Sequence, residues 1–187
     1  MILNRFYVEE LIRRALLEDI HYCDVTSDYL IPEEQMGEGR LMAKADGIVC
    51  GVEVAAEVFR MLDASTEIKI LRHDGDRISY GEDIMHLKGK TAVLLKGERT
   101  ALNLIQHMSG IASATNRYVE IVKGTKATIA DTRKTLPGLR PLQKYAVTVG
   151  GGKNHRYDLS DAAMLKDNHI DAAGGITAAI TKLREQK

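Results

Sequence analysis

The sequence has few cysteines, no net charge and no long apolar segment, and each of these features argues against a class of protein. It has only two cysteines, Cys23 and Cys50, with no CxxC spacing, which argues against a disulfide scaffold or a zinc knuckle and fits a reducing cytoplasm. Its 26 basic residues are balanced by 26 acidic ones, so no global field attracts nucleic acid or an anionic membrane. The start of the chain has no secretory pattern, and the longest uncharged helical stretch, residues 100–116, is too polar to span a bilayer. We expect a cytoplasmic protein without nucleic-acid or membrane partners.

The first part of the chain alternates between helical and strand-like patterns. Asn4 is a candidate cap for a helix whose apolar stripe runs from Phe6 to Leu16. After Gly37, short β-rich pieces are separated by glycine turns and by one helix, residues 52–63. The predicted strands cover residues 40–45, 47–51, 66–71 and 83–89. This pattern is typical of a small α+β domain, to which we assign residues 1–107.

The rest of the chain, residues 108–187, has a different pattern. Two helices are predicted around a Ser-Gly break, and then strand, helix, strand and helix follow in turn, which is how a parallel α/β arrangement begins. The helices are predicted at residues 94–108, 111–122, 141–149 and 176–186, and the strands at residues 126–131 and 162–167. Ligands gather at the carboxyl ends of parallel strands, and both predicted strands end in charged residues. We therefore expect a binding site at those two ends.

A local excess of positive charge lies near these strand ends. Between Thr132 and Tyr157 there are six basic residues and no acidic one, namely Arg133, Lys134, Arg140, Lys144, Lys153 and Arg156. Arginine grips a carboxylate through two parallel hydrogen bonds, whereas lysine is a compact charge suited to phosphate. Arg140 and Lys144 flank a helix and are expected on its solvated face. Arg133, Lys134, Arg156 and Lys166 lie at strand ends or beside the glycines, where we expect an anionic ligand.

Residues 150–156, GGGKNHR, place three glycines directly before a basic stretch. Such a run suggests steep turns or close approach of the main chain to a ligand, with a solvated turn as the alternative. His155, between Asn154 and Arg156, is expected to hydrogen-bond a ligand or a neighbour. A second cluster, His21, Cys23 and Asp24, has no returning set of ligands elsewhere in the sequence, so no metal site is predicted there.

Several segments together resemble a known enzyme family. They are GERTALNLIQHMSGIAS at 97–113, TRKTLPGLR at 132–140, YAVTVGGGKNHR at 145–156 and LSDAAMLKDNHI at 159–170, and ALLEDIHYCDVTS at 15–27 is similar to the family's amino-terminal signature. The family is that of the quinolinate phosphoribosyltransferases. The resemblance implies an α/β fold, with an N-terminal α+β sandwich domain followed by the first part of an open α/β (TIM-like) barrel. Because two strands cannot close a barrel, we expect the sequence to be a fragment.

The resemblance also implies a reaction and a set of site residues. Family members transfer a phosphoribosyl group from phosphoribosyl pyrophosphate, with Mg²⁺, to quinolinate and release CO₂. The implied substrate-binding residues are Arg99, Thr132, Arg133, Lys134, His155, Arg156 and Lys166. Lys134, on the pyrophosphate side, and Lys166 are the implied catalytic residues. Arg99 would enter the neighbouring subunit's site, which implies a homodimer or a larger homo-oligomer.

Three alternatives remain open from the sequence. A related pyrophosphorylase-like protein of metal-transport operons would share the architecture and have an unknown substrate. Residues 75–89 could instead form a carrier hairpin like those of biotinyl or lipoyl domains, although such a domain has its lysine at the hairpin tip and Lys88 is expected near a strand end. The chain could also be a folded or dimerising fragment without catalytic activity.

Overall fold

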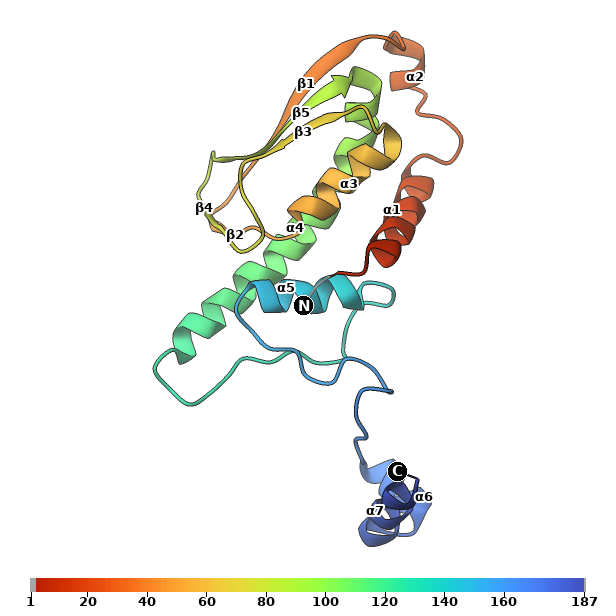
Figure 1. Cartoon of the computed structure of the whole chain (residues 1–187), viewed down its shortest axis with the longest axis vertical. Coiled ribbons are helices and arrows are strands. Elements are labelled where there is room, and N and C mark those ends of the chain that lie inside the picture. The colour runs from red at the N-terminus through yellow and green to blue at the C-terminus, as the bar shows by residue number, and fades with distance from the viewer. Residues whose placement is uncertain (1–2, 187) are drawn as a thin grey trace. The chain divides into compact units, whose positions relative to one another are not determined.

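The computed structural model describes residues 3–186, which form two compact units. The first unit ends at His155 and the second begins at Arg156. In the first unit (Figure 1) the helices are α1 (Arg5–Asp19), α2 (Ser27–Leu30), α3 (Val52–Leu62), α4 (Thr91–Val122) and α5 (Arg140–Val149). Its strands are β1 (Met36–Met42), β2 (Gly47–Ile48), β3 (Glu67–Ile70), β4 (Arg77–Ile78) and β5 (Asp83–Lys90). The second unit contains α6 (Asp167–Ala173) and α7 (Ile176–Glu185).

An antiparallel sheet organises the first unit. Strand β5 lies in the centre, between β1 and β3, while β2 and β4 form a separate two-stranded pair. Because side chains alternate across a strand, Met85 and Leu87 of β5 are buried while His86 and Lys88 face solvent. The strands expected in this region are confirmed, with shifted ends, and β4 is an addition to them.

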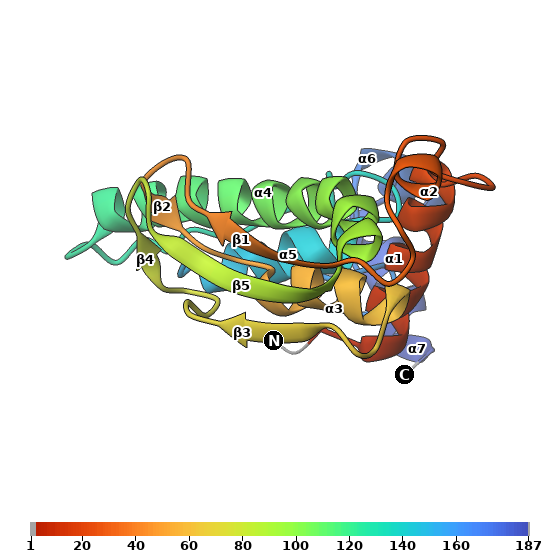
Figure 2. The ribbon, with the colours of Figure 1, turned by 90° about the horizontal axis from the view of Figure 1, so that it is seen from above.

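Helices α3 and α4 cover one face of the sheet, as Figure 2 shows. Helix α3 is buried along most of its length and places Phe59 against α4. At that contact α4 carries Gly97, where an added Cβ would lie 2.8 Å from the Phe59 ring. Helix α1 begins as predicted, because Asn4 Oδ1 accepts hydrogen bonds from the N–H groups of Phe6 and Tyr7. Val8 and Ile12 of its stripe are buried, but Phe6 is 80% exposed.

Helix α4 is a single helix, so the predicted break at Ser109 and Gly110 is wrong. The Ser109 hydroxyl accepts a hydrogen bond from the Cys50 N–H and donates one to the Cys50 carbonyl. Ser113 makes the same two contacts with Ile48. These serines connect the helix to the chain around β2. Gly110 does not end the helix, because a glycine inside a helix costs only about 1 kcal/mol.

The two strands predicted after residue 122 are not formed as strands. Residues 126–131 contribute only a single parallel bridge, between Ala130 and Lys153, and residues 162–166 have no regular structure. A parallel strand requires neighbouring strands for its main-chain hydrogen bonds. Within residues 3–186, the first segment forms one bridge and the second forms none. The helices α5 and α7 are confirmed where the sequence predicted them. The boundary at 107/108 falls inside α4 and stays a prediction.

The second unit is small and largely exposed. Helices α6 and α7 pack on each other across Gly174, whose φ of 84° lets the chain leave α6 in the left-handed conformation. Ala179 is its one buried residue between 156 and 186. Across residues 3–186, no helix combines the length and apolar character that crossing a bilayer requires.

Candidate functional site

Two segments of the first unit that were predicted to carry site residues lie side by side. We call residues 129–134 and 153–155 the loop pair. The Asp131 N–H donates to the Lys153 carbonyl at 3.1 Å, and the Lys153 N–H donates to the Ile129 carbonyl at 2.9 Å. The two segments run parallel from this bridge. Thr132, Arg133 and Lys134 therefore lie just after the bridge on one segment, and His155 lies just after it on the other.

The loop pair carries cations that the protein does not neutralise. Within the part of the chain that the structure describes, the side chains of Arg133, Lys134 and Lys153 have no hydrogen-bond or ion-pair partner. The Nε atom of Arg133 is also buried. A buried donor without an acceptor is costly, and a ligand carboxylate would satisfy it. The loop pair is therefore suited to bind an anion.

Lys144, one of the six cations, is buried and paired with an acid, so its expected place on a solvated face is wrong. Its side chain is 0% exposed and its Nζ lies 2.5 Å from Asp131 Oδ1. Asp131 stands one residue before the acid-free stretch, so the sequence count missed the neutralising charge. Arg140 is half-buried and donates from Nε to the Thr135 hydroxyl at 3.0 Å. Neither residue belongs to the unpaired group.

The three glycines of residues 150–152 bring the chain close to its own helices. A Cβ at Gly150 would lie 2.4 Å from the Ala112 carbonyl of α4, and one at Gly152 would lie 2.8 Å from Val147 of α5. Gly151 has a φ of 91°, which L side chains rarely adopt. The main chain at these glycines therefore lies close to α4 and α5. Lys153, the first loop-pair residue of this segment, follows directly.

Three predicted site residues lie outside the loop pair. Arg156 belongs to the second unit, where its Nη1 donates to the Ala162 carbonyl at 2.7 Å and its buried Nε has no partner among residues 3–186. Lys166 is exposed, and its main-chain N–H donates to His169 Nδ1 at 3.1 Å at the start of α6. Arg99 is exposed on α4. The substrate-binding roles of these three residues stay predictions.

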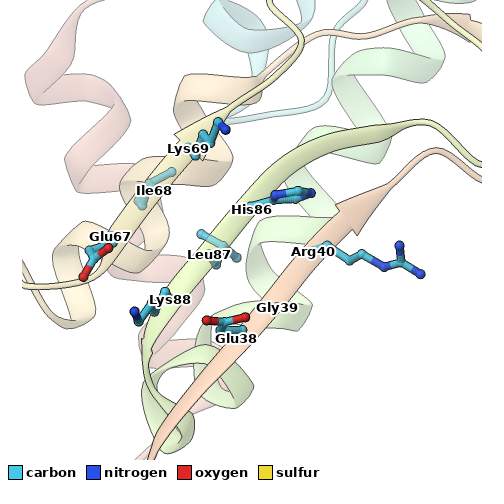
Figure 3. A pocket seen from close by; sticks show the side chains of 9 residues that line it. All are labelled: Glu38, Gly39, Arg40, Glu67, Ile68, Lys69, His86, Leu87 and Lys88. Atoms are coloured by element: carbon cyan, nitrogen blue, oxygen red, sulfur yellow. The ribbon is translucent and has the colours of Figure 1, made fainter.

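The outer face of the sheet holds a second group of charges, shown in Figure 3. A hollow of about 580 Å³ lies over β1, β5 and β3. Lys88 stands in the central strand, with Glu38 opposite it on one side and Glu67 on the other. The interpretation of residues 75–89 as a carrier hairpin is wrong, because Lys88 lies inside a paired strand instead of at a hairpin tip.

The cluster around Asp24 has a structural role. Asp24 Oδ1 accepts hydrogen bonds from the N–H groups of Thr26 and Ser27, and hydrogen bonds from Ser27 lower the pKa of Asp24. Between residues 3 and 186, no three His, Cys, Asp or Glu side chains gather as a metal-binding group. Cys50 is buried, and this burial raises the pKa of its thiol, as expected of a core cysteine.

Two protein-family models together match almost the whole chain. Residues 24–109 match the N-terminal domain of quinolinate phosphoribosyl transferase and residues 111–187 match its C-terminal domain. A probable nicotinate-nucleotide pyrophosphorylase (carboxylating) of Bacillus subtilis is 44% identical over 98% of this chain and 63% of its own length. The nicotinate-nucleotide pyrophosphorylase (carboxylating) of Mycobacterium leprae is 45% identical over 92% of this chain and 62% of its own length.

Solved structures agree with this assignment and confirm the expected mixed α/β fold. NadC from Streptococcus pyogenes matches with a TM-score of 0.94 at 41% identity, over 100% of this chain and 66% of its own. The nicotinate-nucleotide pyrophosphorylase from Francisella tularensis matches with a TM-score of 0.93 at 39% identity, over the same shares. The chain thus spans somewhat less than two thirds of the length of these relatives. With both domain models matched in order and this identity sustained along the chain, it belongs to the quinolinate phosphoribosyltransferase family.

Proposed function

We propose that this chain binds quinolinate and transfers to it the phosphoribosyl group of phosphoribosyl pyrophosphate, giving nicotinate mononucleotide, pyrophosphate and CO₂. Such an enzyme is a pentosyltransferase of NAD biosynthesis. Relatives named as carboxylating pyrophosphorylases or decarboxylating quinolinate phosphoribosyltransferases support the reaction. We propose the cytoplasm as its location, in keeping with its cysteine content.

The observation that carries the proposal is the set of unpaired cations in the loop pair. Arg133, Lys134 and Lys153 have no acidic partner among residues 3–186, and one nitrogen of Arg133 is buried without an acceptor. Quinolinate carries two adjacent carboxylates on a planar ring, and a guanidinium matches a carboxylate with two parallel hydrogen bonds. In the proposal Arg133 binds a carboxylate, Thr132 and His155 complete the polar wall, and Lys134 faces the pyrophosphate.

Residues outside the loop pair complete the proposed set. Arg156 and Lys166 bind the quinolinate carboxylates, and Lys166 joins Lys134 as a catalytic residue. The buried, unpartnered Nε of Arg156 supports this role. In the proposal Mg²⁺ accompanies phosphoribosyl pyrophosphate; among residues 3–186 no three His, Cys, Asp or Glu side chains gather to hold a metal ion.

The chemistry requires orientation and charge more than a nucleophilic side chain. The lone pair of the ring nitrogen forms a bond to the anomeric carbon of the ribose, while the bond to pyrophosphate breaks and its electron pair leaves with pyrophosphate. The bond from the ring to the adjacent carboxylate then breaks, CO₂ departs, and the pyridinium nitrogen stabilises the remaining carbanion until a solvent proton restores C–H. The residues contribute by positioning two anions against each other and by stabilising developing charge.

The proposal is tested by binding and by turnover. Calorimetry on the wild-type chain should show quinolinate binding more tightly than nicotinate, which has one carboxylate. Arg133→Ala should weaken quinolinate binding roughly tenfold to a hundredfold, because a charge-assisted hydrogen bond contributes about 1.5 to 3 kcal/mol. The matched control is Arg14→Ala, since Arg14 forms only an exposed pair with Glu10 on α1. Release of ¹⁴CO₂ from carboxyl-labelled quinolinate, with phosphoribosyl pyrophosphate and Mg²⁺, measures turnover.

Two outcomes would contradict the proposal. One is wild-type protein that binds nicotinate and quinolinate equally, because the second carboxylate would then have no receptor. The other is an Arg133→Ala variant with the affinity of Arg14→Ala, because the loop pair would then take no part in binding.

A homo-oligomer is part of the proposal because Arg99 is exposed on α4 and is expected to act on a neighbouring subunit. Subunits carrying Arg99→Ala and subunits carrying Arg133→Ala should each be impaired alone. If they form mixed dimers, the Arg99→Ala subunit keeps its own Arg133 and receives Arg99 from its neighbour. Mixing the two variants should therefore restore part of the activity, and mixtures no better than either variant would show that Arg99 does not act between subunits.

A further inference from the structure

One buried carboxylate connects three parts of the first unit. The Asp131 side chain is 7% exposed, and its Oδ1 accepts from Lys144 Nζ at 2.5 Å and from the His155 N–H at 2.8 Å. When the Asn154 amide is oriented to satisfy both of its polar atoms, its nitrogen donates to Asp131 Oδ2 at 2.6 Å. Lys144 Nζ also lies 3.4 Å from the His155 carbonyl. Helix α5 and both segments of the loop pair therefore meet at Asp131.

Main-chain pairing alone holds the loop pair at one point only. The two bonds around the Ala130–Lys153 bridge fix the register there, and no ladder continues beyond it. Arg133 and His155 follow this bridge, so their relative position depends on what binds the chain past it. The contacts from Asp131 to His155 and Asn154 are made at that point.

We propose that the Lys144–Asp131 ion pair is a positioning element that sets the distance between Arg133 and His155 in the substrate site. This inference rests on the proposed function. Lys144 is a positioning residue and not a catalytic one, because its fully buried ammonium is enclosed by Asp131 and His155. It orients the Asp131 carboxylate, which in turn holds the His155 main chain.

The buried ion pair is suited to positioning more than to stabilising the fold. A buried ion pair loses so much solvation that a well-packed apolar pair of similar volume is often equally stable or more so. What the pair adds is direction, since hydrogen bonds in a buried network fix the groups they join. Misplacing a substrate-binding group by about 1 Å can cost up to about a hundredfold in rate.

The test replaces both members of the pair in the full 187-residue chain. The double variant Lys144→Met with Asp131→Leu, called the apolar pair, removes the ion pair and leaves neither charge buried without its partner, so we expect it to fold. Hydrogen exchange at the His155 amide should become at least about tenfold faster, because that N–H loses its acceptor. Quinolinate binding, by calorimetry, should weaken about tenfold to a hundredfold.

Two further variants separate positioning from packing. The neutral pair, Lys144→Gln with Asp131→Asn, keeps a donor and an acceptor and should recover most of the quinolinate affinity that the apolar pair loses. Leu142→Ala removes a fully buried side chain from the same helix while keeping the ion pair. It should lower the melting temperature but leave the His155 exchange and the affinity close to wild type.

The outcomes are distinct for this inference and for the proposed function. Wild-type affinity in the apolar pair, unchanged His155 exchange in it, or a neutral pair no better than the apolar pair would each overturn the positioning role. Wild-type protein that fails to bind quinolinate would overturn the proposed function and, with it, the substrate-positioning role. Faster exchange, lost affinity and recovery by the neutral pair would together support the inference.

Discussion

The outer sheet face and the loop pair are both rich in charge, but they differ in whether acidic residues lie next to the basic ones. On the sheet, the antiparallel register places Lys88 between Glu38 and Glu67, so opposite charges face each other across strands. In the loop pair, Asp131 pairs with the buried Lys144 and leaves Arg133 and its basic neighbours without acids. Basic residues with acidic neighbours need no ligand to balance their charge, whereas basic residues without such neighbours indicate an anion site.

The two regions also differ in what holds them together. Three strands joined by main-chain ladders hold the sheet, and α3 and α4 pack beneath it. One bridge and one buried carboxylate hold the loop pair. A single substitution should therefore disturb the loop pair far more than the sheet face.

The largest expected contrast comes from removing one lysine in each region. Lys144→Met leaves the Asp131 charge buried without its partner and should lower the free energy of unfolding by about 3 to 5 kcal/mol. Lys88→Met, on the exposed sheet face, should change it by less than about 0.5 kcal/mol. Urea denaturation measures both. Equal effects would show that the buried pair is not essential to this part of the fold.

The next contrast concerns packing beneath the sheet. Gly97→Ala places a Cβ 2.8 Å from the Phe59 ring, so we expect overpacking that costs about 1 to 3 kcal/mol of stability. Gly110 lies on the same helix with no atom within 4 Å of an added Cβ. Gly110→Ala should therefore stabilise the protein by up to about 1 kcal/mol, through helix propensity. Thermal unfolding of the two variants should move the midpoint in opposite directions.

A smaller effect on stability should appear at alkaline pH, at the contact between Tyr145 of α5 and Asp74. Burial, followed by the nearby Asp74 charge, raises the pKa of Tyr145, whose hydroxyl donates to Asp74 Oδ2 at 2.9 Å. Above the unfolded pKa of about 10, the folded state binds more protons, so stability should fall as pH rises from there toward the raised pKa. Tyr145→Phe should cost about 1 kcal/mol at neutral pH and abolish this contribution. Identical alkaline slopes in both proteins would contradict it.

The smallest effect is expected from reversing one charge on the sheet face. Glu67→Lys places two like charges directly opposite each other, at Lys88 and residue 67, and should cost about 0.2 to 1 kcal/mol. The cost should shrink in high salt because both side chains are exposed. Glu33→Lys, in an exposed loop, is the matched control. A salt-independent loss would mean that cross-strand charge balance is not its cause.

Much of the fold could be predicted from the sequence because the signals are local. The Asn4 cap, the apolar spacing of α3 and the alternation in β5 depend on neighbours a few residues away. The strand predicted at residues 162–167 failed because a strand depends on partners that its own sequence cannot supply. The break expected at Ser109 failed because that hydroxyl bonds to Cys50, 59 residues away, while the helix continues.

The sequence by itself determined the family, the positions of helices α1, α3, α5 and α7 and the concentration of basic residues between Thr132 and Tyr157, because these follow from residue identity and short spacing. Only the tertiary structure decided which of those cations stay unpaired. Lys144 looked like a solvated helix residue until the fold brought Asp131, 13 residues away, to its ammonium and buried both. The energy of a charge depends on its surroundings in space, and chain folding alone supplies those surroundings.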